Sequence, residues 1–141
     1  MTQLSEAPTD LQKRLDRAFN PRTVAVVGDK GAMGYLWLNC MKTFDGKVYS
    51  VQVDPNEIPG IDAMGVPNYA SLMDIADEID YVVCAVPRPV AARIIAGCIE
   101  KKVGAVMLFT SGFAETETED GIAAQEQIRR ASCRERVCLV V

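Results

Sequence analysis

Glycines and a lysine gather directly after an apolar run, in the segment 28–34, which reads GDKGAMG. In a glycine-rich turn that opens a helix, backbone N–H groups can approach a phosphate, and the positive end of the helix favours the anion. Lys30 would add a direct charge, and at Gly31 we expect either close approach of a ligand or a positive φ. The spacing G-x-x-G-x-x-G differs from the dinucleotide pattern G-x-G-x-x-G. A phosphate-binding turn and a purely structural turn are therefore the two interpretations.

A second apolar run ends in an acid, within the segment 53–57, which reads VDPNE. Asp54 stands where a dinucleotide-binding fold places the carboxylate that holds a ribose. Asp, Pro and Asn also favour turns for reasons of their own, so an ordinary turn is the alternative interpretation.

Two more apolar runs are followed by residues that could meet a ligand. Arg88, between Pro87 and Pro89, presents a guanidinium, although the two prolines could serve only to shape the start of a helix. The segment 110–112, which reads TSG, offers two hydroxyls and a flexible backbone, with an ordinary loop as the alternative.

The elements that must position these residues alternate along the chain. Apolar, β-branched runs predict strands at 23–28, 47–54, 80–86, 105–109 and 136–141. Helical spacing predicts helices at 11–19, 33–43, 90–99 and 119–131, and a short one that starts at Ser71. Such alternation is typical of an α/β, Rossmann-like doubly wound parallel sheet of about five strands. We expect a single domain over residues 10–141 after a flexible N-terminus at 1–9. In such sheets ligands bind outside the carboxyl ends of the strands, where all four segments would lie.

Composition excludes several classes of function. The 141 residues include no histidine, which removes histidine-dependent triads, phosphohistidine carriers and His-ligated zinc. The net charge of −4 argues against a nucleic-acid partner, because duplex binders carry a dense excess of Lys and Arg. An acidic run at 115–120 is expected to complement a helix N-terminus rather than to bind a metal. Trp37 and the six methionines are interpreted as core filler.

The cysteines and the N-terminus bear on the compartment. Five cysteines, an odd number without a C-x-x-C pair, predict buried reduced thiols rather than disulfides. The N-terminal segment lacks the apolar stretch of a signal peptide, and the longest apolar runs are strand-length. We therefore expect a soluble cytoplasmic domain with no membrane partner.

Taken together, these segments resemble a known family. They read FNPRTVAVVGDKGAMG, then VYSVQVDP followed shortly by IPG, then SLMDIADEIDYVVCAVP, and AVMLFTSGFAE. In this order they look like the CoA-binding domain of nucleoside-diphosphate-forming acyl-CoA synthetases, which are relatives of the succinyl-CoA synthetase alpha subunit. The resemblance covers residues 15–128.

The resemblance implies that coenzyme A is the cofactor. Residues 30–33 would lie on the pyrophosphate and pantetheine of coenzyme A, and the turn at 53–57 would border its adenosine end. Residues 86–88 would flank the adenine or its ribose, and residues 110–112 would approach the pantetheine arm. The cofactor-binding positions are Gly28, Lys30, Gly31, Ala32, Met33, Gly34, Val53, Asp54, Pro55, Asn56, Val86, Pro87, Arg88, Thr110, Ser111 and Gly112.

Two departures from the family pattern stand out. Many members have Asn in place of Asp54 and a Lys shortly after the proline, where this chain has Asn56 and Glu57, so phosphate contact is expected to be weaker. In the family the fifth strand leads into a Gly-Pro-Asn turn and a domain with a phosphorylated histidine. Here the sequence ends at Val141, and the segment 132–136 matches poorly.

These observations favour a CoA-binding module of an ADP- or GDP-forming acid–thiol ligase that is not catalytic alone. Its partners would be CoA or acyl-CoA and either further ligase domains or a beta-type subunit. An NAD(P)-binding domain of an oxidoreductase and a ligand-free regulatory module of the same fold are the alternatives.

Overall fold

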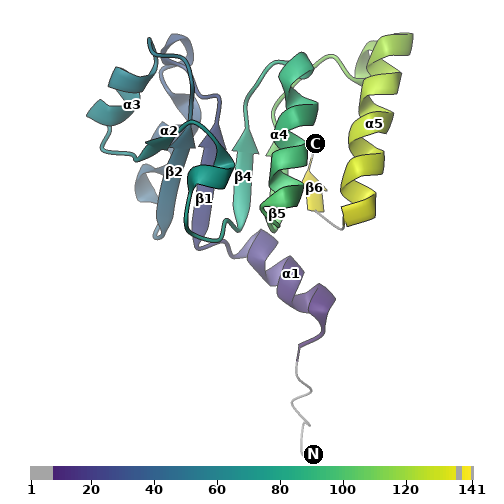
Figure 1. Ribbon diagram of the computed structural model, residues 1–141, viewed down its shortest axis with the longest axis horizontal. Coiled ribbons are helices and arrows are strands. Elements are labelled where there is room, and N and C mark those ends of the chain that lie inside the picture. The colour runs from purple at the N-terminus through teal and green to yellow at the C-terminus, as the bar shows by residue number, and fades with distance from the viewer. Residues whose placement is uncertain (1–7, 136–137, 141) are drawn as a thin grey trace, which may run out of the picture.

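Strand β1 (Thr23–Val27) runs through the middle of a parallel sheet in a computed structural model that describes residues 8–135 and 138–140. Within these residues the sheet has six strands in the order β3-β2-β1-β4-β5-β6, and every neighbouring pair is parallel (Figure 1). The other strands are β2 (Lys47–Val51), β3 (Asn68–Tyr69), β4 (Tyr81–Cys84), β5 (Ala105–Leu108) and β6 (Cys138–Val140). The predicted α/β doubly wound sheet is confirmed.

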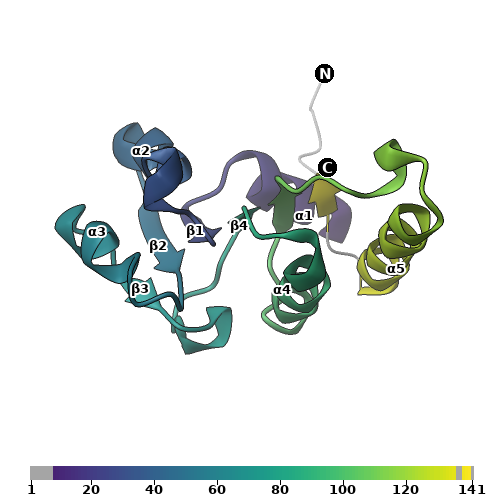
Figure 2. The same cartoon turned by 90° about the horizontal axis from the view of Figure 1, so that it is seen from above.

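Helices cover the two faces of this sheet unequally. The α-helices are α1 (Asp10–Phe19), α2 (Leu36–Cys40), α3 (Ile58–Ala63), α4 (Arg88–Glu100) and α5 (Glu119–Glu135). Short 3-10 turns lie at Gly31–Met33, Met41–Thr43, Leu72–Asp74 and Ala114–Thr116. Figure 2 shows α4 and α5 on one side of the sheet and α2 on the other. No helix in the described part of the chain is both long and apolar enough to cross a bilayer.

The core follows from the alternation of side chains along the buried strands. All five residues of β1 are buried, and Ala25 and Val27 pack with α4 and α5 side chains such as Ile95. Val24 and Val26, which point to the opposite face, pack with Leu38 of α2 and Ile61 of α3. A strand covered on both sides leaves no polar positions, which is why its sequence reads as a continuous apolar run.

The elements expected from the sequence differ from the structure in several places. Helix α3 was not predicted, and the short helix expected from Ser71 is only the 3-10 turn at Leu72–Asp74. The short edge strand β3 was missed, because two residues such as Asn68 and Tyr69 leave no pattern. The predicted helix at 33–43 is broken into α2 between two 3-10 turns. Of the predicted strand at 136–141, β6 covers Cys138–Val140; residues 136, 137 and 141, and residues 1–7 of the predicted flexible terminus, lie outside the described residues.

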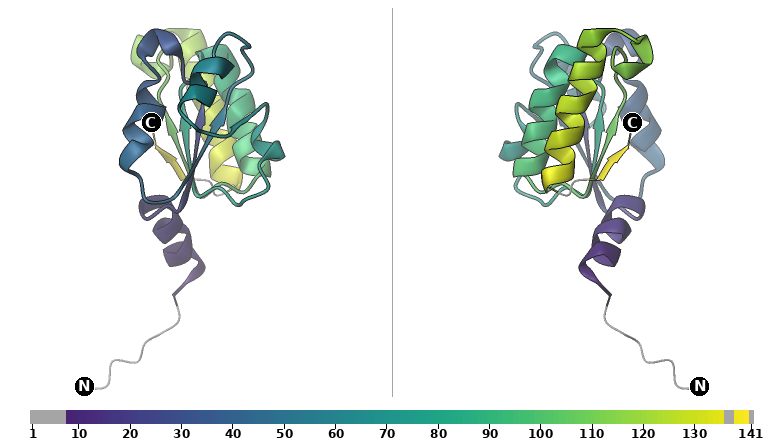
Figure 3. Two further views of the ribbon diagram at one scale, coloured as in Figure 1. Left: turned by 90° about the vertical axis from the view of Figure 1, so that its left-hand side faces the viewer. Right: turned by 90° about the vertical axis from the view of Figure 1, so that its right-hand side faces the viewer.

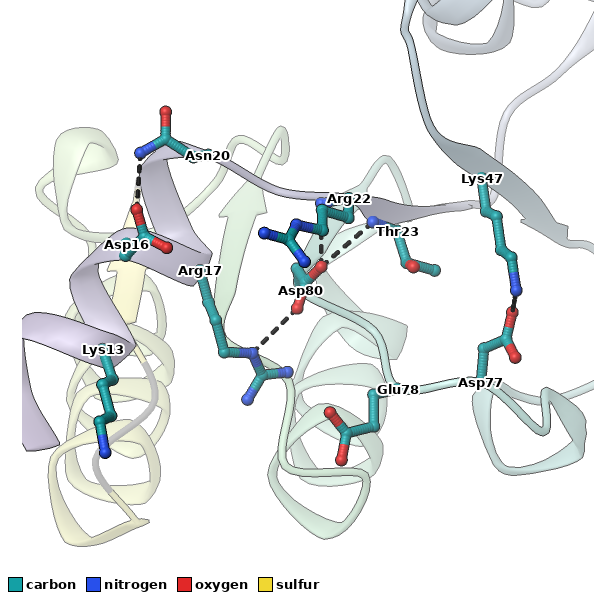
Figure 4. Close-up of a pocket in the computed structure, with 10 residues that line it drawn as sticks. All are labelled: Lys13, Asp16, Arg17, Asn20, Arg22, Thr23, Lys47, Asp77, Glu78 and Asp80. Atoms are coloured by element: carbon teal, nitrogen blue, oxygen red, sulfur yellow. Dashed lines mark hydrogen bonds and ion pairs between the residues drawn. The ribbon is translucent and has the colours of Figure 1, made fainter.

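Helix α1 lies beyond the amino-terminal edge of the sheet, away from both faces (Figure 3). The Arg17 guanidinium attaches it to the body by donating to Asp80 Oδ1 over 2.9 Å and to the carbonyl of Ile79 over 3.1 Å. Asp80 Oδ2 also accepts from the backbone N–H groups of Arg22 and Thr23 (Figure 4). One carboxylate therefore joins the helix, the start of β1 and the start of β4.

The cysteines are only partly as predicted. Cys84 and Cys98 are buried and reduced, and burial raises the pKa of both thiols, that of Cys84 to about 11. Cys40 and Cys133 are free but exposed, so the expectation of buried thiols was wrong for these two. Their helices turn these positions to solvent, which an odd cysteine count cannot reveal.

Candidate functional site

The exits of β1 and β4 meet at the point where the strand order reverses. Strand β1 pairs with β2 on one side and with β4 on the other, so the chain leaves these two central strands toward opposite faces. Gly28 has a φ of 82°, and a Cβ there would lie 2.6 Å from Val86 Cγ1 and 2.8 Å from the carbonyl oxygen of Ala85. Only glycine fits such a close approach in this conformation. This crevice is where open α/β sheets bind ligands.

A cavity of about 250 Å³ opens at this crevice. It is lined by Gly28, Asp29, Lys30, Met33, Leu36, Trp37, Ala85, Val86, Pro87 and Phe109. A larger hollow of about 520 Å³ lies at the opposite edge of the sheet, where Arg17 pairs with Asp80 and Lys47 pairs with Asp77 (Figure 4). The smaller cavity is the better candidate because it combines apolar walls with the strand exits.

Exposed apolar side chains form the wall of this cavity. Met33 is 64% exposed, Leu36 39% and Phe109 57%, and Trp37 is half-buried. The Trp37 and Phe109 rings meet edge to face, with their centroids 4.9 Å apart. The interpretation as core filler was therefore wrong for Met33, whereas Trp37 is half-buried and packs against the core beside Leu38. A cluster of exposed apolar groups in a concave site is suited to the uncharged arm of a ligand.

The glycine-rich loop is largely occupied by its own hydrogen bonds. The N–H groups of Met33 and Gly34 donate to the carbonyls of Lys30 and Gly31, and the N–H of Lys30 donates to the Asp29 side chain. The Gly31 N–H donates to Glu57 Oε2 over 2.7 Å. Gly28 and Gly34 have positive φ, and Gly31 does not. A positive φ, one of the two expected reasons for glycine at position 31, was therefore wrong. A Cβ at 31 would meet Glu57 Oε2 and the Tyr35 hydroxyl, each at 3.2 Å.

Asp29 has a structural role that was not predicted from the sequence. It is 3% exposed, and its carboxylate accepts from the N–H groups of Lys30 and, over 2.8 Å, of Leu38 in the first turn of α2. Gln52, also buried, donates to the carbonyl of Asp29 and so joins the exits of β1 and β2. An Asp shortly before a helix is a capping signal, which was available in the sequence.

The turn after β2 is built by its own side chains. Asp54 Oδ1 accepts from both the backbone N–H and the side-chain amide of Asn56, each over 3.0 Å. Asp54 therefore builds an ordinary turn, which was the alternative interpretation, and its carboxylate is hydrogen-bonded within that turn. Val53 is 68% exposed at the same turn, and Pro55 and Asn56 are also exposed.

The third and fourth segments are joined by Arg88. Its guanidinium donates to the carbonyl of Gly112 over 2.5 Å and to Asp120 over 2.7 Å, which lowers the pKa of the Asp120 carboxyl. The Thr110 hydroxyl donates to the carbonyl of Val86 over 2.7 Å. The guanidinium is therefore engaged by the chain itself, and part of the acidic run serves as its partner. Ser111 is exposed beside them.

A family model described as a CoA binding domain matches residues 22–140, which include every one of these segments. The chain belongs to this CoA-binding domain family. The six strands, the glycine-rich exit and the turn after β2 all fall within the matched range, whereas α1 precedes it.

Relatives and solved structures agree with this assignment. The alpha subunit of an ADP-forming acetate–CoA ligase II from Pyrococcus furiosus is 37% identical over 74% of this chain. A crystal structure of a Pyrococcus horikoshii protein matches 90% of this chain with a TM-score of 0.79 and 31% identity. The matched part is 29% of the Pyrococcus horikoshii chain. The dinucleotide-forming acetyl-coenzyme A synthetase 1 of Ca. Korarchaeum cryptofilum matches 89% with a TM-score of 0.75 and 28% identity.

The chain spans only part of these proteins. It covers 23% of the Pyrococcus furiosus subunit and 27% of the Korarchaeum synthetase. It is thus homologous to one portion of acyl-CoA synthetases that are several times longer.

Proposed function

We propose that this domain binds coenzyme A at the cavity between the exits of β1 and β4. The observation that carries the proposal is the pairing of an apolar wall with a glycine-rich exit at the point where the strand order reverses. Coenzyme A has the same two parts, a long uncharged pantetheine arm and a phosphate-rich nucleotide. Family membership supports the same ligand.

The pantetheine arm would lie along Met33, Trp37 and Phe109, with Val86 and Pro87 on the other side of the cavity. The pyrophosphate would meet Lys30 and the N–H of Ala32, which has no partner within the described chain. The adenosine end would reach toward the turn at 53–56. Arg88, Thr110 and Gly112 would act mainly by holding the two exits beside the arm, because their polar atoms are already hydrogen-bonded.

We further propose that the domain holds CoA for an ADP-forming acyl-CoA synthetase, together with further ligase domains or a beta-type subunit. Several relatives are named as ADP-forming acetate–CoA ligases or subunits of them. The resemblance implies that ligation passes a phosphoryl group through a histidine, and this sequence has none. The residues of this chain would therefore bind and orient CoA, while the phosphoryl chemistry would come from the other domains.

Calorimetric titration of the purified chain with CoA, NAD⁺ and ADP tests the proposal. We expect CoA to bind with a Kd in the micromolar range or weaker, about −8 kcal/mol at best. NAD⁺ should bind less well, because Asp54 is engaged in its own turn rather than held for a ribose. Tighter binding of NAD⁺ than of CoA would contradict the proposal.

A further inference from the structure

A carboxylate of the chain itself stands at the glycine-rich loop. Glu57 Oε2 accepts the hydrogen bond of the Gly31 N–H over 2.7 Å. The neighbouring N–H groups of Met33 and Gly34 are bound within the loop, so Gly31 is one of the few donors that the loop directs to an anion. A ligand phosphate that used this donor would have to take the place of the carboxylate.

The position of Glu57 is fixed by contacts from both segments. Its N–H donates to the carbonyl of Asp54 over 3.0 Å, and its own carbonyl accepts from the Tyr35 hydroxyl over 3.1 Å. Tyr35 adopts a φ of 49°, which is costly for a side chain of this size. Gly60 leaves room for the ring, since a Cβ there would lie 2.1 Å from the Tyr35 hydroxyl. The loop and the turn after β2 thus hold the carboxylate between them.

The negative charge of Glu57 opposes the binding of a ligand phosphate at the Gly31 N–H. A carboxylate and a phosphate both accept from N–H donors, and two anions at one donor repel each other. The charge that faces the Gly31 N–H in this chain is that of the Glu57 carboxylate, and it is negative.

We infer that Glu57 is a selectivity element that weakens the binding of ligand phosphates at the Gly31 N–H. A phosphate reaches that donor only after the carboxylate moves away, so affinity depends more on the apolar arm of the ligand than on its phosphates. The inference rests on the proposed CoA site and concerns how that site ranks its ligands.

Titration of CoA into the wild type, Glu57→Gln and Glu100→Gln at 0.15 M salt tests it. Gln keeps an oxygen that can accept from Gly31 but removes the charge, so the melting temperature should stay within about 2 °C of the wild type. We expect Glu57→Gln to bind CoA about tenfold more tightly. Glu100→Gln removes the same charge from the exposed end of α4, and should stay within about twofold of the wild type.

A second measurement uses the wild type alone. In a ¹⁵N-labelled sample, saturating CoA should shift the Gly31 amide signal, because its carboxylate acceptor is replaced by a phosphate. CoA binding with equal or weaker affinity in Glu57→Gln, or with no shift at Gly31, would overturn the inference and leave the proposed function standing. No binding of CoA by any of the three folded proteins would overturn the proposed function, and the inference with it.

Discussion

Phe109, at the exit of β5, meets Trp37 of α2 edge to face at the cavity, with an angle of 66° between the rings. The contact joins α2 to the exit of β5 and leaves Phe109 57% exposed. An aromatic side chain that is held in place but remains open to solvent offers a surface for a ligand at little conformational cost.

Phe109→Ala should therefore separate binding from stability. We expect CoA affinity to fall about tenfold, because the arm loses an aromatic contact worth about 1 kcal/mol or slightly more. The free energy of unfolding should change by less than about 1 kcal/mol, since most of the ring is already in water. Calorimetry and urea unfolding measure the two quantities. Phe19→Ala, at a 78% exposed position in α1, is the control and should leave CoA affinity unchanged.

Gly28 and Gly34 both have positive φ but differ in what surrounds them. A Cβ at Gly28 would clash with Val86 and the Ala85 carbonyl, whereas at Gly34 nothing lies within 4 Å. Gly28→Ala should destabilise the fold by about 3 kcal/mol, from backbone strain and from displacement of the β4 exit. Gly34→Ala should cost about 1 kcal/mol, from strain alone. Equal losses of unfolding free energy in urea would mean that the exits of β1 and β4 leave room for a Cβ at position 28.

The sheet was predictable because burial on both faces leaves a strong mark on the sequence. Val24, Val26 and Val82 belong to runs without polar positions, and in a parallel sheet the ends of such runs must share one edge. The arrangement of the strand exits at one edge followed from topology, before any side chain was placed.

The contacts within the site were not predictable in the same way. The Gly31–Glu57 hydrogen bond depends on how two turns curve toward each other, which no periodicity records. The role of Trp37 depends on whether a helix covers it, and residue type alone cannot decide that. Arg88 was predicted as a site residue, and its partners Gly112 and Asp120 come from a distant segment that only the fold brings near.

Cys40, Cys84, Cys98 and Cys133 should differ sharply in reactivity. Burial raises the pKa of Cys84 to about 11 and raises that of Cys98 as well, so both remain protonated thiols at pH 8. Cys40 and Cys133 are exposed. Brief iodoacetamide treatment at pH 8, with peptide mapping by mass spectrometry, should label the exposed pair at least tenfold faster. Treatment in guanidinium chloride is the control that should remove the difference, and equal labelling of the native protein would show that the core opens readily.

Asp80 should stabilise the fold in a pH-dependent manner. Although burial opposes its charge, hydrogen bonds from the Arg17 side chain and from the N–H groups of Arg22 and Thr23 lower the pKa of the Asp80 carboxyl. A carboxyl whose pKa is depressed by folding contributes stability above its unfolded pKa, about 3.9, and loses that contribution as pH falls through the folded value. Asp80→Asn should therefore reduce the free energy of unfolding at pH 7 by about 1–3 kcal/mol, because three donors lose a charged acceptor.

Asp77→Asn provides the matched control for this prediction. Asp77 Oδ2 also accepts from a cation, Lys47, and from the Tyr49 hydroxyl. The Lys47 and Asp77 side chains are 64% and 34% exposed, and such surface ion pairs contribute at most about 1 kcal/mol. Urea unfolding of the wild type and both variants at pH 7, 5 and 3 makes the comparison. The deficit of Asp80→Asn should be largest at pH 7 and 5 and should shrink at pH 3, where the wild-type carboxyl begins to protonate. A deficit that matches that of Asp77→Asn at every pH would show that the attachment of α1 to the sheet contributes no more than an ordinary surface ion pair.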